Sequence, residues 1–175
     1  PLYMEEKKLT AAAPSMSAYL TEFNRNYKEV NELYHDTALH LGLSDSAFDI
    51  LYHLCENGDG CQQKDICAAT CIPKQTIHSS IRNLEQSGYL TLARGRGRGM
   101  LISLTDAGRE LVQKTIFPVI QRENEAFACM TPEECRQMLA LQAKYTKALR
   151  TSLSALFQTE LPAHATNTDM KGISL

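Results

Sequence analysis

Apolar residues recur at every third or fourth position along most of the chain, which is the spacing of one face of an α-helix. The first such stretch predicts a long amphipathic helix over residues 16–41, and Gly42 ends it. Ser44 then caps a second helix, because its side chain can accept a hydrogen bond from a free N–H of the first turn. A short third helix is predicted over residues 63–69.

A tight connection separates this third helix from the next one. Pro73 suits the start of a helix, where its missing N–H is not needed. Ile77, Ile81 and Leu84 follow at the spacing of one buried face, so a fourth helix is predicted over residues 74–87.

Strand composition replaces the helical pattern after Gly88, which stops the fourth helix. Residues 89–93 and 100–104 are rich in β-forming and apolar side chains. The Gly-rich segment 94–99 lies between them, and two such runs joined by glycines are typical of a β-hairpin.

The C-terminal third returns to helical spacing. Thr105 caps a helix that extends to about residue 129 and is expected to bend at Pro118, which lacks an N–H. Thr131 opens a capping box and a last helix whose apolar stripe reaches Leu156. The polar, aperiodic residues 158–175 predict a flexible tail.

The order helix, tight turn, helix and hairpin predicts a winged helix–turn–helix: a mainly α fold with a small β-hairpin and flanking dimerisation helices. The apolar stripes of the first and last helices are too long to bury inside a small winged domain, so they predict a homodimer. The expected organisation is an N-terminal extension (1–15), a dimerisation helix (16–43), a winged DNA-binding domain (44–104), linker and dimerisation helices (105–157) and the tail (158–175).

Composition limits the class of protein. The chain has 175 residues, of which 43% are hydrophobic and 22% are charged, so it can build a core. No apolar run approaches the roughly 20 residues that span a bilayer, and residues 1–15 lack the apolar stretch of a secretory signal. We therefore expect a soluble, cytoplasmic protein without a membrane partner.

Charge is distributed unevenly along the chain. Net charge is −2, yet residues 61–104 contain six basic and two acidic residues, whereas the rest contains 12 basic and 18 acidic residues. A basic segment in an acidic chain favours a polyanionic partner. The alternative is a basic surface without a partner.

The outward face of the fourth helix carries hydrogen-bonding groups and no acid before Glu85. Gln75 and Arg82 are suited to base edges in the major groove, whereas Arg96 and Arg98 of the predicted wing are suited to phosphates or the minor groove. The alternative is an ordinary solvated helix face, which more often carries Glu beside Lys. The predicted contacts to double-stranded operator DNA are Gln63, Lys64, Lys74, Gln75, Thr76, His78, Ser79, Arg82, Arg94, Arg96 and Arg98.

Four segments, residues 62–66, 72–77, 84–90 and 103–109, resemble the successive signatures of the MarR family of bacterial transcriptional regulators. The resemblance covers roughly residues 16–157. It implies an obligate homodimer whose first and last helices interlock, with two winged domains on a pseudo-palindromic operator. It also implies a regulator, here predicted to be a repressor, whose DNA affinity is modulated by a small molecule or an oxidant.

Six cysteines raise the question of redox or metal chemistry. Their spacing does not match the paired cysteines of a zinc site. Cys55, Cys61 and Cys67 are predicted to be small buried apolar side chains. Cys71 is the redox candidate, because it lies near Lys74 and a helix N-terminus, both of which favour the thiolate.

Two further features of the first helix suggest ligands. Tyr27 and Tyr34 are predicted to line a cleft for a small-molecule inducer; the alternative is that both rings belong to the dimer core. The pairs Glu32 with His35 and Asp36 with His40 could face a metal, but such residues are usually only solvated, so no metal or cofactor is predicted. The two pairs are Glu32, His35, Asp36 and His40.

No motif of an enzyme is present: the sequence lacks Gly-x-Ser-x-Gly, His-Glu-x-x-His and Gly-x-Gly-x-x-Gly. We therefore expect no enzymatic activity. Two alternatives to the operator-binding regulator remain, a winged-helix scaffold for protein interactions and a metal- or redox-sensing regulator that uses Cys or His and Glu ligands.

Overall fold

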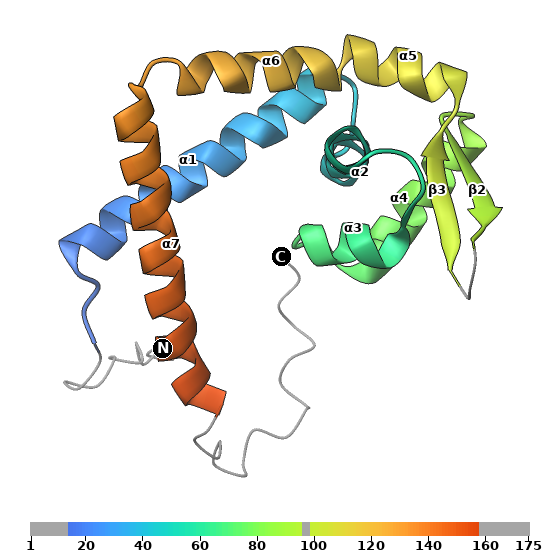
Figure 1. Ribbon diagram of the computed structural model, residues 1–175. Helices are drawn as coiled ribbons and strands as arrows, with labels where there is room; N and C mark the ends of the chain where they lie inside the picture. The colour runs from blue at the N-terminus through green and yellow to red at the C-terminus, as the bar shows by residue number, and fades with distance from the viewer. Residues whose placement is uncertain (1–13, 96–98, 158–175) are drawn as a thin grey trace, which may run out of the picture. The chain divides into compact units, whose positions relative to one another are not determined.

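The computed structural model describes residues 14–95 and 99–157 of the chain (Figure 1). Contacts between its elements divide the chain into two units, residues 1–120 and residues 121–175. The predicted tail lies outside the described residues, as do Arg96 and Arg98 and all but the last two residues of the predicted N-terminal extension.

Both N-terminal helices are present, α2 begins at its predicted cap, and α1 begins two residues after the predicted start, at a serine cap that was not predicted. Helix α1 (Ala18–His40) follows Ser17, whose side chain accepts a hydrogen bond from the Leu20 N–H at 3.1 Å. Helix α2 (Asp45–Asn57) follows Ser44, whose Oγ accepts from the Ala47 N–H at 3.2 Å. Gly42 separates the helices with a φ of 71°, a conformation that costs glycine little.

The helix–turn–helix is formed by α3 (Gln63–Ala69) and α4 (Lys74–Gln86). Helix α4 ends as predicted, because Gly88 adopts a φ of 80° and the next backbone N–H returns to the Leu84 carbonyl at 2.9 Å. Ser46 of α2 and Ser80 of α4 share a buried hydrogen bond of 2.5 Å, which fixes α4 against α2.

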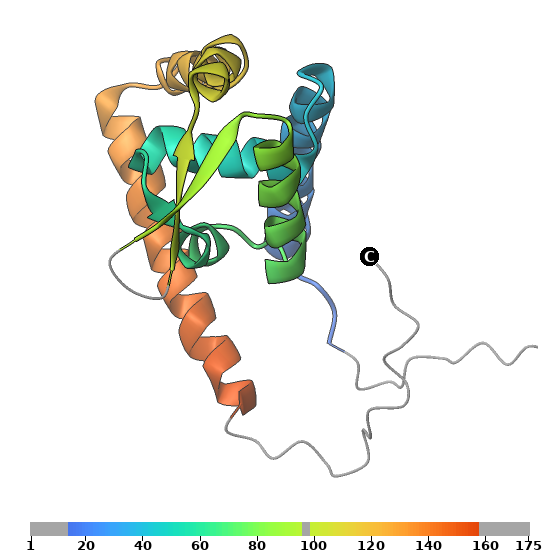
Figure 2. The same cartoon turned by 90° about the vertical axis from the view of Figure 1, so that its right-hand side faces the viewer.

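The sheet has one strand more than the sequence predicted. Strands β2 (Leu90–Arg94) and β3 (Met100–Leu104) form the expected antiparallel hairpin, and β1 (Cys61–Gln62) pairs with the other edge of β3. Cys61 lies opposite Ile102 in this ladder. Figure 2 shows the hairpin with α4 beside it. This is the winged helix–turn–helix that the sequence indicated.

The core is formed mainly by α2, α3, α4, the sheet and α5 (Asp106–Lys114), and Ala38 of α1 and Ile116 also belong to it. Its fully buried side chains come from every one of these elements, so the winged segment is held together by its own apolar residues. They include Ile50, Leu51, Leu54, Ile66, Ile77, Ile102 and Val112.

The predicted bent helix after Thr105 is instead two helices, α5 and α6 (Ile116–Phe127). The break falls at Thr115, which has a φ of −114°, and not at Pro118. Pro118 is the third residue of α6, in the first turn, where no intrahelical partner exists for an N–H. The expected bend at the proline was therefore wrong, because the chain starts a new helix before it.

The second unit contains α7 (Pro132–Ser154) and a short 3-10 turn, η1 (Ala155–Phe157). The predicted capping box is present: the Thr131 N–H donates to Glu134 Oε2 at 2.8 Å, and the Glu134 N–H donates to Thr131 Oγ1 at 3.2 Å. The bond from the Thr131 N–H, together with a second from the Thr131 hydroxyl to Glu134 Oε2 at 3.0 Å, lowers the pKa of the Glu134 carboxyl. Across residues 14–95 and 99–157, no helix combines the length and apolar composition needed to cross a membrane.

Candidate nucleic-acid interface

Helix α4 has the two faces that the sequence predicted. Ile77 and Ile81 are buried in the core, whereas Gln75, Thr76 and Ser79 are exposed to solvent. The Ser79 hydroxyl donates to the Gln75 carbonyl of the preceding turn at 3.0 Å. The exposed side of α4 therefore presents an amide and hydroxyls in positions from which they can reach another molecule.

A groove of about 770 Å³ runs between the helix–turn–helix and the hairpin. Elements α3, α4, β2 and β3 all contribute to its walls, so it exists only because the wing folds back beside the two helices. Five of the eleven predicted DNA contacts line it, namely Gln63, Lys64, Lys74, His78 and Arg82. The fold thus gathers residues that are up to 19 positions apart in the sequence.

Four of the remaining predicted contacts do not line this groove. Gln75, Thr76 and Ser79 are on the exposed face of α4, and Arg94 is exposed at the end of β2, opposite Met100. The last two, Arg96 and Arg98, belong to the part of the wing outside the described residues.

Positive charge in the groove is only partly neutralised. Arg82 Nη1 lies 2.8 Å from Glu85 Oε2, an ion pair within α4 that the sequence analysis did not anticipate. Among the residues that the structure describes, neither Lys64 nor Lys74 forms an ion pair. Asp65 is engaged in the cap of α3, where it accepts from the Gln62 N–H at 2.7 Å. The two lysines therefore keep their charge available for an anion.

Gln63 ties α3 to α4. Its Nε2 donates to the Lys74 carbonyl at 3.4 Å, and its Oε1 lies 3.2 Å from His78 Nδ1. Both polar atoms of this amide are thus engaged within the protein. Gln63 was predicted as a DNA contact from the sequence, and the structure places its side chain against α4.

The base of the wing is held by an ionic network that the sequence analysis missed. Asp59 Oδ1 accepts from the Leu104 N–H at 2.8 Å, and Asp59 Oδ2 lies 3.3 Å from Arg109 Nη1. Arg109 also donates to the Leu104 carbonyl at 3.0 Å and pairs with Asp106 at 2.9 Å. The network joins the turn before β1, the end of β3 and α5. In the sequence, the only indication of this network was Asp59, an acidic residue between two glycines.

Close packing also holds the base of the wing. A Cβ atom on Gly108 would lie 2.0 Å from the Tyr89 carbonyl oxygen, so α5 approaches the start of β2 too closely for any other residue. The Thr105 side chain, which caps α5, also donates to the Gly88 carbonyl at 2.6 Å. The wing is therefore anchored at its base by α5.

The cysteines differ in their surroundings. Burial, with a contribution from Asp59, raises the pKa of Cys55 to about 11. Burial, reinforced by Asp65, also raises the pKa of Cys61 to about 11. These two thiols and Cys67 are partly buried, less completely than the sequence predicted, whereas Cys71 is exposed on the connection between α3 and α4.

The predicted inducer residues do not line the groove described above. The Tyr34 ring lies 6.3 Å from that of Phe48, centroid to centroid, and Tyr27 is 61% exposed. A smaller cavity of about 230 Å³ is bounded by α2, β3 and α5, with Arg109 and Phe117 in its wall.

One of the two candidate metal pairs on α1, Glu32 with His35, has other partners. His35 Nδ1 lies 2.9 Å from Asp45 Oδ2 and links α1 to α2. Glu32 pairs with Lys28 at 3.4 Å. Within residues 14–95 and 99–157, no three His, Cys, Asp or Glu side chains gather as metal ligands would.

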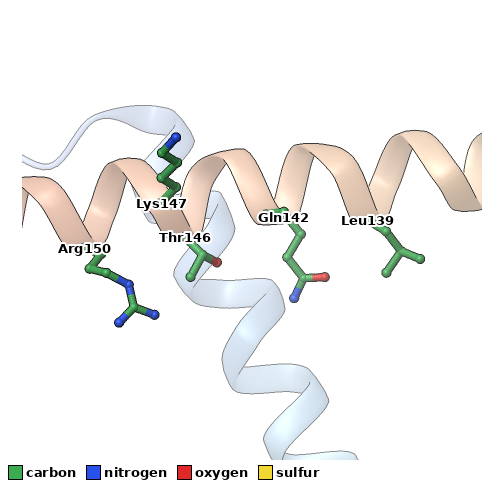
Figure 3. Close-up of a pocket in the computed structure, with 6 residues that line it drawn as sticks. Leu139, Gln142, Thr146, Lys147 and Arg150 are labelled. Carbon is green, nitrogen blue, oxygen red and sulfur yellow. The ribbon is translucent and has the colours of Figure 1, made fainter.

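Helix α7 carries an open groove of about 460 Å³ on one side. Figure 3 shows Gln142, Thr146 and Arg150 projecting from the same side of the helix, with Leu139 one turn away. All of the groove's lining residues belong to α7, so it is a feature of a single helix surface and not an enclosed site.

Comparison with known proteins agrees with this geometry. Residues 41–99 match the model of the MarR family, which confirms the resemblance drawn from the sequence motifs. No curated protein matches the sequence. The chain resembles in fold NMB1585, a MarR family regulator from Neisseria meningitidis, with a TM-score of 0.70 and 20% identity over 80% of this chain and 99% of that chain.

Two further solved structures share the fold. MepR of Staphylococcus aureus, in a complex with DNA, matches with a TM-score of 0.61 and 23% identity over 77% of this chain and 99% of that chain. BpsR of Bordetella bronchiseptica, whose DNA binding is regulated by 6-hydroxynicotinic acid, matches with a TM-score of 0.56 and 24% identity. The match covers 77% of this chain and 98% of that chain. At these identities the likeness concerns the fold.

Proposed function

We propose that this chain, which carries the MarR family segment at residues 41–99, is a homodimeric transcriptional regulator that binds pseudo-palindromic operator DNA and acts as a repressor. The observation that carries the proposal is the groove beside α4, where Lys64, Lys74 and Arg82 converge next to an outward helix face without acidic residues before Glu85. Such a face combines attraction to phosphates with groups that reach base edges. The DNA complex of MepR, which shares the fold, supports this proposal.

Two kinds of contact are proposed, and α4 (Lys74–Gln86) contributes to both. On the stiff helix α4, Gln75 and Arg82 are proposed to contact base edges in the major groove. Lys64, Lys74 and Arg94 are proposed to contact phosphates, which positions the helix without reading sequence. Arg96 and Arg98 are proposed to extend these contacts from the wing to phosphates or the minor groove. Thr76, His78 and Ser79 complete the proposed interface.

The surface of the two long helices supports the proposed homodimer. Phe23 and Leu33 of α1 are 46% and 62% exposed, and Leu141 and Leu153 of α7 are 64% and 46% exposed. Apolar side chains repeated along a helix at this exposure mark an interface. Two copies related by a two-fold axis would present two α4 helices to the two halves of a pseudo-palindromic site.

A small molecule or an oxidant is proposed to modulate the affinity for DNA. The regulation of BpsR by 6-hydroxynicotinic acid supports a ligand of low molecular weight. Tyr27 and Tyr34 remain the proposed ligand residues, and exposed Cys71 the proposed redox residue. We propose a binding protein without enzymatic activity, acting in the cytoplasm where bacterial DNA lies.

The experiment that tests the function is binding to genomic DNA fragments at several salt concentrations. We expect a small set of fragments to remain bound at high salt, and Lys74→Ala to lower the slope of log affinity against log salt by about one per phosphate contact. Lys114→Ala, an exposed lysine at the end of α5, is the matched control and should leave the slope unchanged. A protein that retains no fragment at low salt but captures a protein partner would be a scaffold.

A further inference from the structure

The amide of Gln63 can be oriented from its surroundings. One of its polar atoms lies 3.4 Å from the Lys74 carbonyl oxygen, which can only accept a hydrogen bond. That atom must therefore be the donor Nε2. The acceptor Oε1 is left facing His78 Nδ1 at 3.2 Å.

This orientation determines the protonation of the imidazole. Because Oε1 only accepts, His78 Nδ1 must carry the hydrogen and donate it. In a neutral imidazole one nitrogen donates and the other accepts, so Nε2 is left as a bare acceptor. Gln63 thus selects the Nδ1–H form, whereas the Nε2–H form predominates in free neutral histidine.

The surroundings of His78 contain an excess of donors. The ring is exposed and lines the groove together with Lys64, Lys74 and Arg82. These three charged side chains donate hydrogen bonds and cannot accept them. An acceptor at His78 Nε2 is therefore complementary to a feature of DNA that its charged neighbours cannot bind.

In the major groove the hydrogen-bond donors are the exocyclic amino groups, N6 of adenine and N4 of cytosine. Building on the DNA-binding function proposed above, we propose that His78 Nε2 accepts a hydrogen bond from such an amino group and so determines specificity at one base of each half-site. Gln63 is the positioning residue that makes this possible. It acts through His78 and does not itself contact a base.

The expected consequence is a preference for an amino base over its keto counterpart at that position, adenine over guanine or cytosine over thymine. With one neutral hydrogen bond the preference should be about three- to tenfold. A keto oxygen there would face a second acceptor, which explains the direction of the preference.

The first test is a nitrogen NMR measurement of the His78 tautomer in the full-length protein without DNA, at a pH where the ring is neutral. We expect a protonated Nδ1 and an unprotonated Nε2 in the wild type, and a shift toward the Nε2–H form in Gln63→Met. His78→Phe identifies the signal by its loss. A wild-type ring protonated at Nε2 would overturn the proposal.

The second test is selection of bound duplexes from a random pool by the wild type, Gln63→Met, His78→Phe and the control Gln113→Met, which replaces an exposed glutamine of α5. We expect Gln63→Met and His78→Phe to lose the three- to tenfold preference at the same single position, with the other positions unchanged. Gln113→Met should select like the wild type.

The outcomes separate the inference from the function on which it rests. If Gln63→Met weakens all sequences alike, Gln63 only ties α3 to α4 and the reading role is wrong. If it changes no position, the tautomer does not determine specificity. If the wild type itself selects no sequence, the proposed DNA-binding function fails, and the NMR result then describes only the Gln63–His78 contact in the free protein.

Discussion

The winged segment and the two longest helices use the same apolar periodicity with opposite results. Seven of the 13 residues of α2 are buried, whereas one of the 23 residues of α1 and none of the 23 residues of α7 are buried. A repeat of three and four residues therefore specifies a helix with an apolar face, but not what covers that face. In the winged segment the partners are in the same chain, and for α1 and α7 we propose a second copy.

This difference gives the two regions of the proposed regulator different roles. The segment that faces DNA packs around its own core, so its grooves and ion pairs are set within one chain. The long helices would set the distance between two such segments in a dimer. Substitutions in the two regions should consequently differ in how their effects depend on protein concentration.

The largest effect is expected in the winged core. Leu51 of α2 is fully buried, and Leu51→Ala should lower the free energy of unfolding by about 3 kcal/mol, because it removes apolar contacts and leaves a cavity. Urea denaturation at two protein concentrations measures this loss. The loss in this monomer core should be the same at both concentrations, and a loss below about 1 kcal/mol would show that the core relaxes around the cavity.

A second, smaller effect is expected at the anchor of the wing. Gly108→Ala would place a Cβ atom 2.0 Å from the Tyr89 carbonyl oxygen, and forcing α5 away from the hairpin should cost about 2 kcal/mol. Gly42→Ala is the matched control, since its Cβ atom would meet no atom within 4 Å. Its cost should be about 1 kcal/mol, because alanine would have to adopt the φ of +71° that glycine adopts there. Thermal unfolding compares the two variants, and equal losses would contradict the close approach of α5.

A third effect should appear only when the protein associates. Leu141 of α7 is 64% exposed, so Leu141→Ala should leave the unfolding free energy of the dilute protein within about 0.5 kcal/mol of the wild type. If α7 forms the dimer interface, the same change should weaken self-association about tenfold. Sedimentation equilibrium measures this constant. A wild type that is monomeric at high concentration would refute the dimer.

These contrasts also show where sequence reasoning succeeds. The limits of α4 and of the hairpin follow from local chemistry, because Pro73 begins the helix region and Gly88 ends it. Strand β1 has only two residues, too few to show an alternating pattern, and it exists because β3, some 40 residues later, offers it an edge. The break at Thr115 was not predicted, because Pro118, which lacks an N–H, was expected to be the point where the helix bends.

Side-chain partners in the candidate interface were harder to predict than its location. The outward position of Gln75 follows from helical spacing alone. The contact between Gln63 and His78 depends on how closely α3 approaches α4, which no local pattern specifies. The Arg82–Glu85 pair was within reach of helical spacing, since residues three apart are neighbours on a helix.

That ion pair gives a fourth prediction. Glu85 holds Arg82 at 2.8 Å and adds a negative charge beside the proposed DNA. Glu85→Gln should therefore raise the affinity for DNA, by about two- to fivefold at low salt, since an exposed pair of this kind is worth roughly 0.2–1 kcal/mol. Glu125→Gln, which breaks the comparable Arg122–Glu125 pair of α6, is the control and should leave the affinity unchanged. A fall in affinity for Glu85→Gln would mean that Glu85 positions Arg82 for DNA.

The smallest effect concerns thiols within the winged segment. Burial raises the pKa of Cys55 and Cys61 to about 11, so in the folded protein both remain thiols at neutral pH, whereas Cys71 is exposed. An alkylating reagent at pH 7–8, roughly the range below the ordinary pKa of cysteine, should therefore label Cys71 well before Cys55 and Cys61, as peptide mass spectrometry can show.

The same raised pKa values determine the sign of a pH effect on stability. Above the ordinary pKa of cysteine, about 8.5, the unfolded chain loses protons from Cys55 and Cys61 while the folded chain still holds them. Their contribution to stability is thus fully present below that pH and is lost as the pH rises through about 11. The free energy of unfolding should fall over this interval, and less steeply in Cys55→Ala and Cys61→Ala. In this pH interval, folding is coupled to proton binding only if the pKa of the thiol is higher in the folded than in the unfolded chain. Equal slopes of unfolding free energy against pH in the wild type and both variants would therefore show that these thiols are not desolvated.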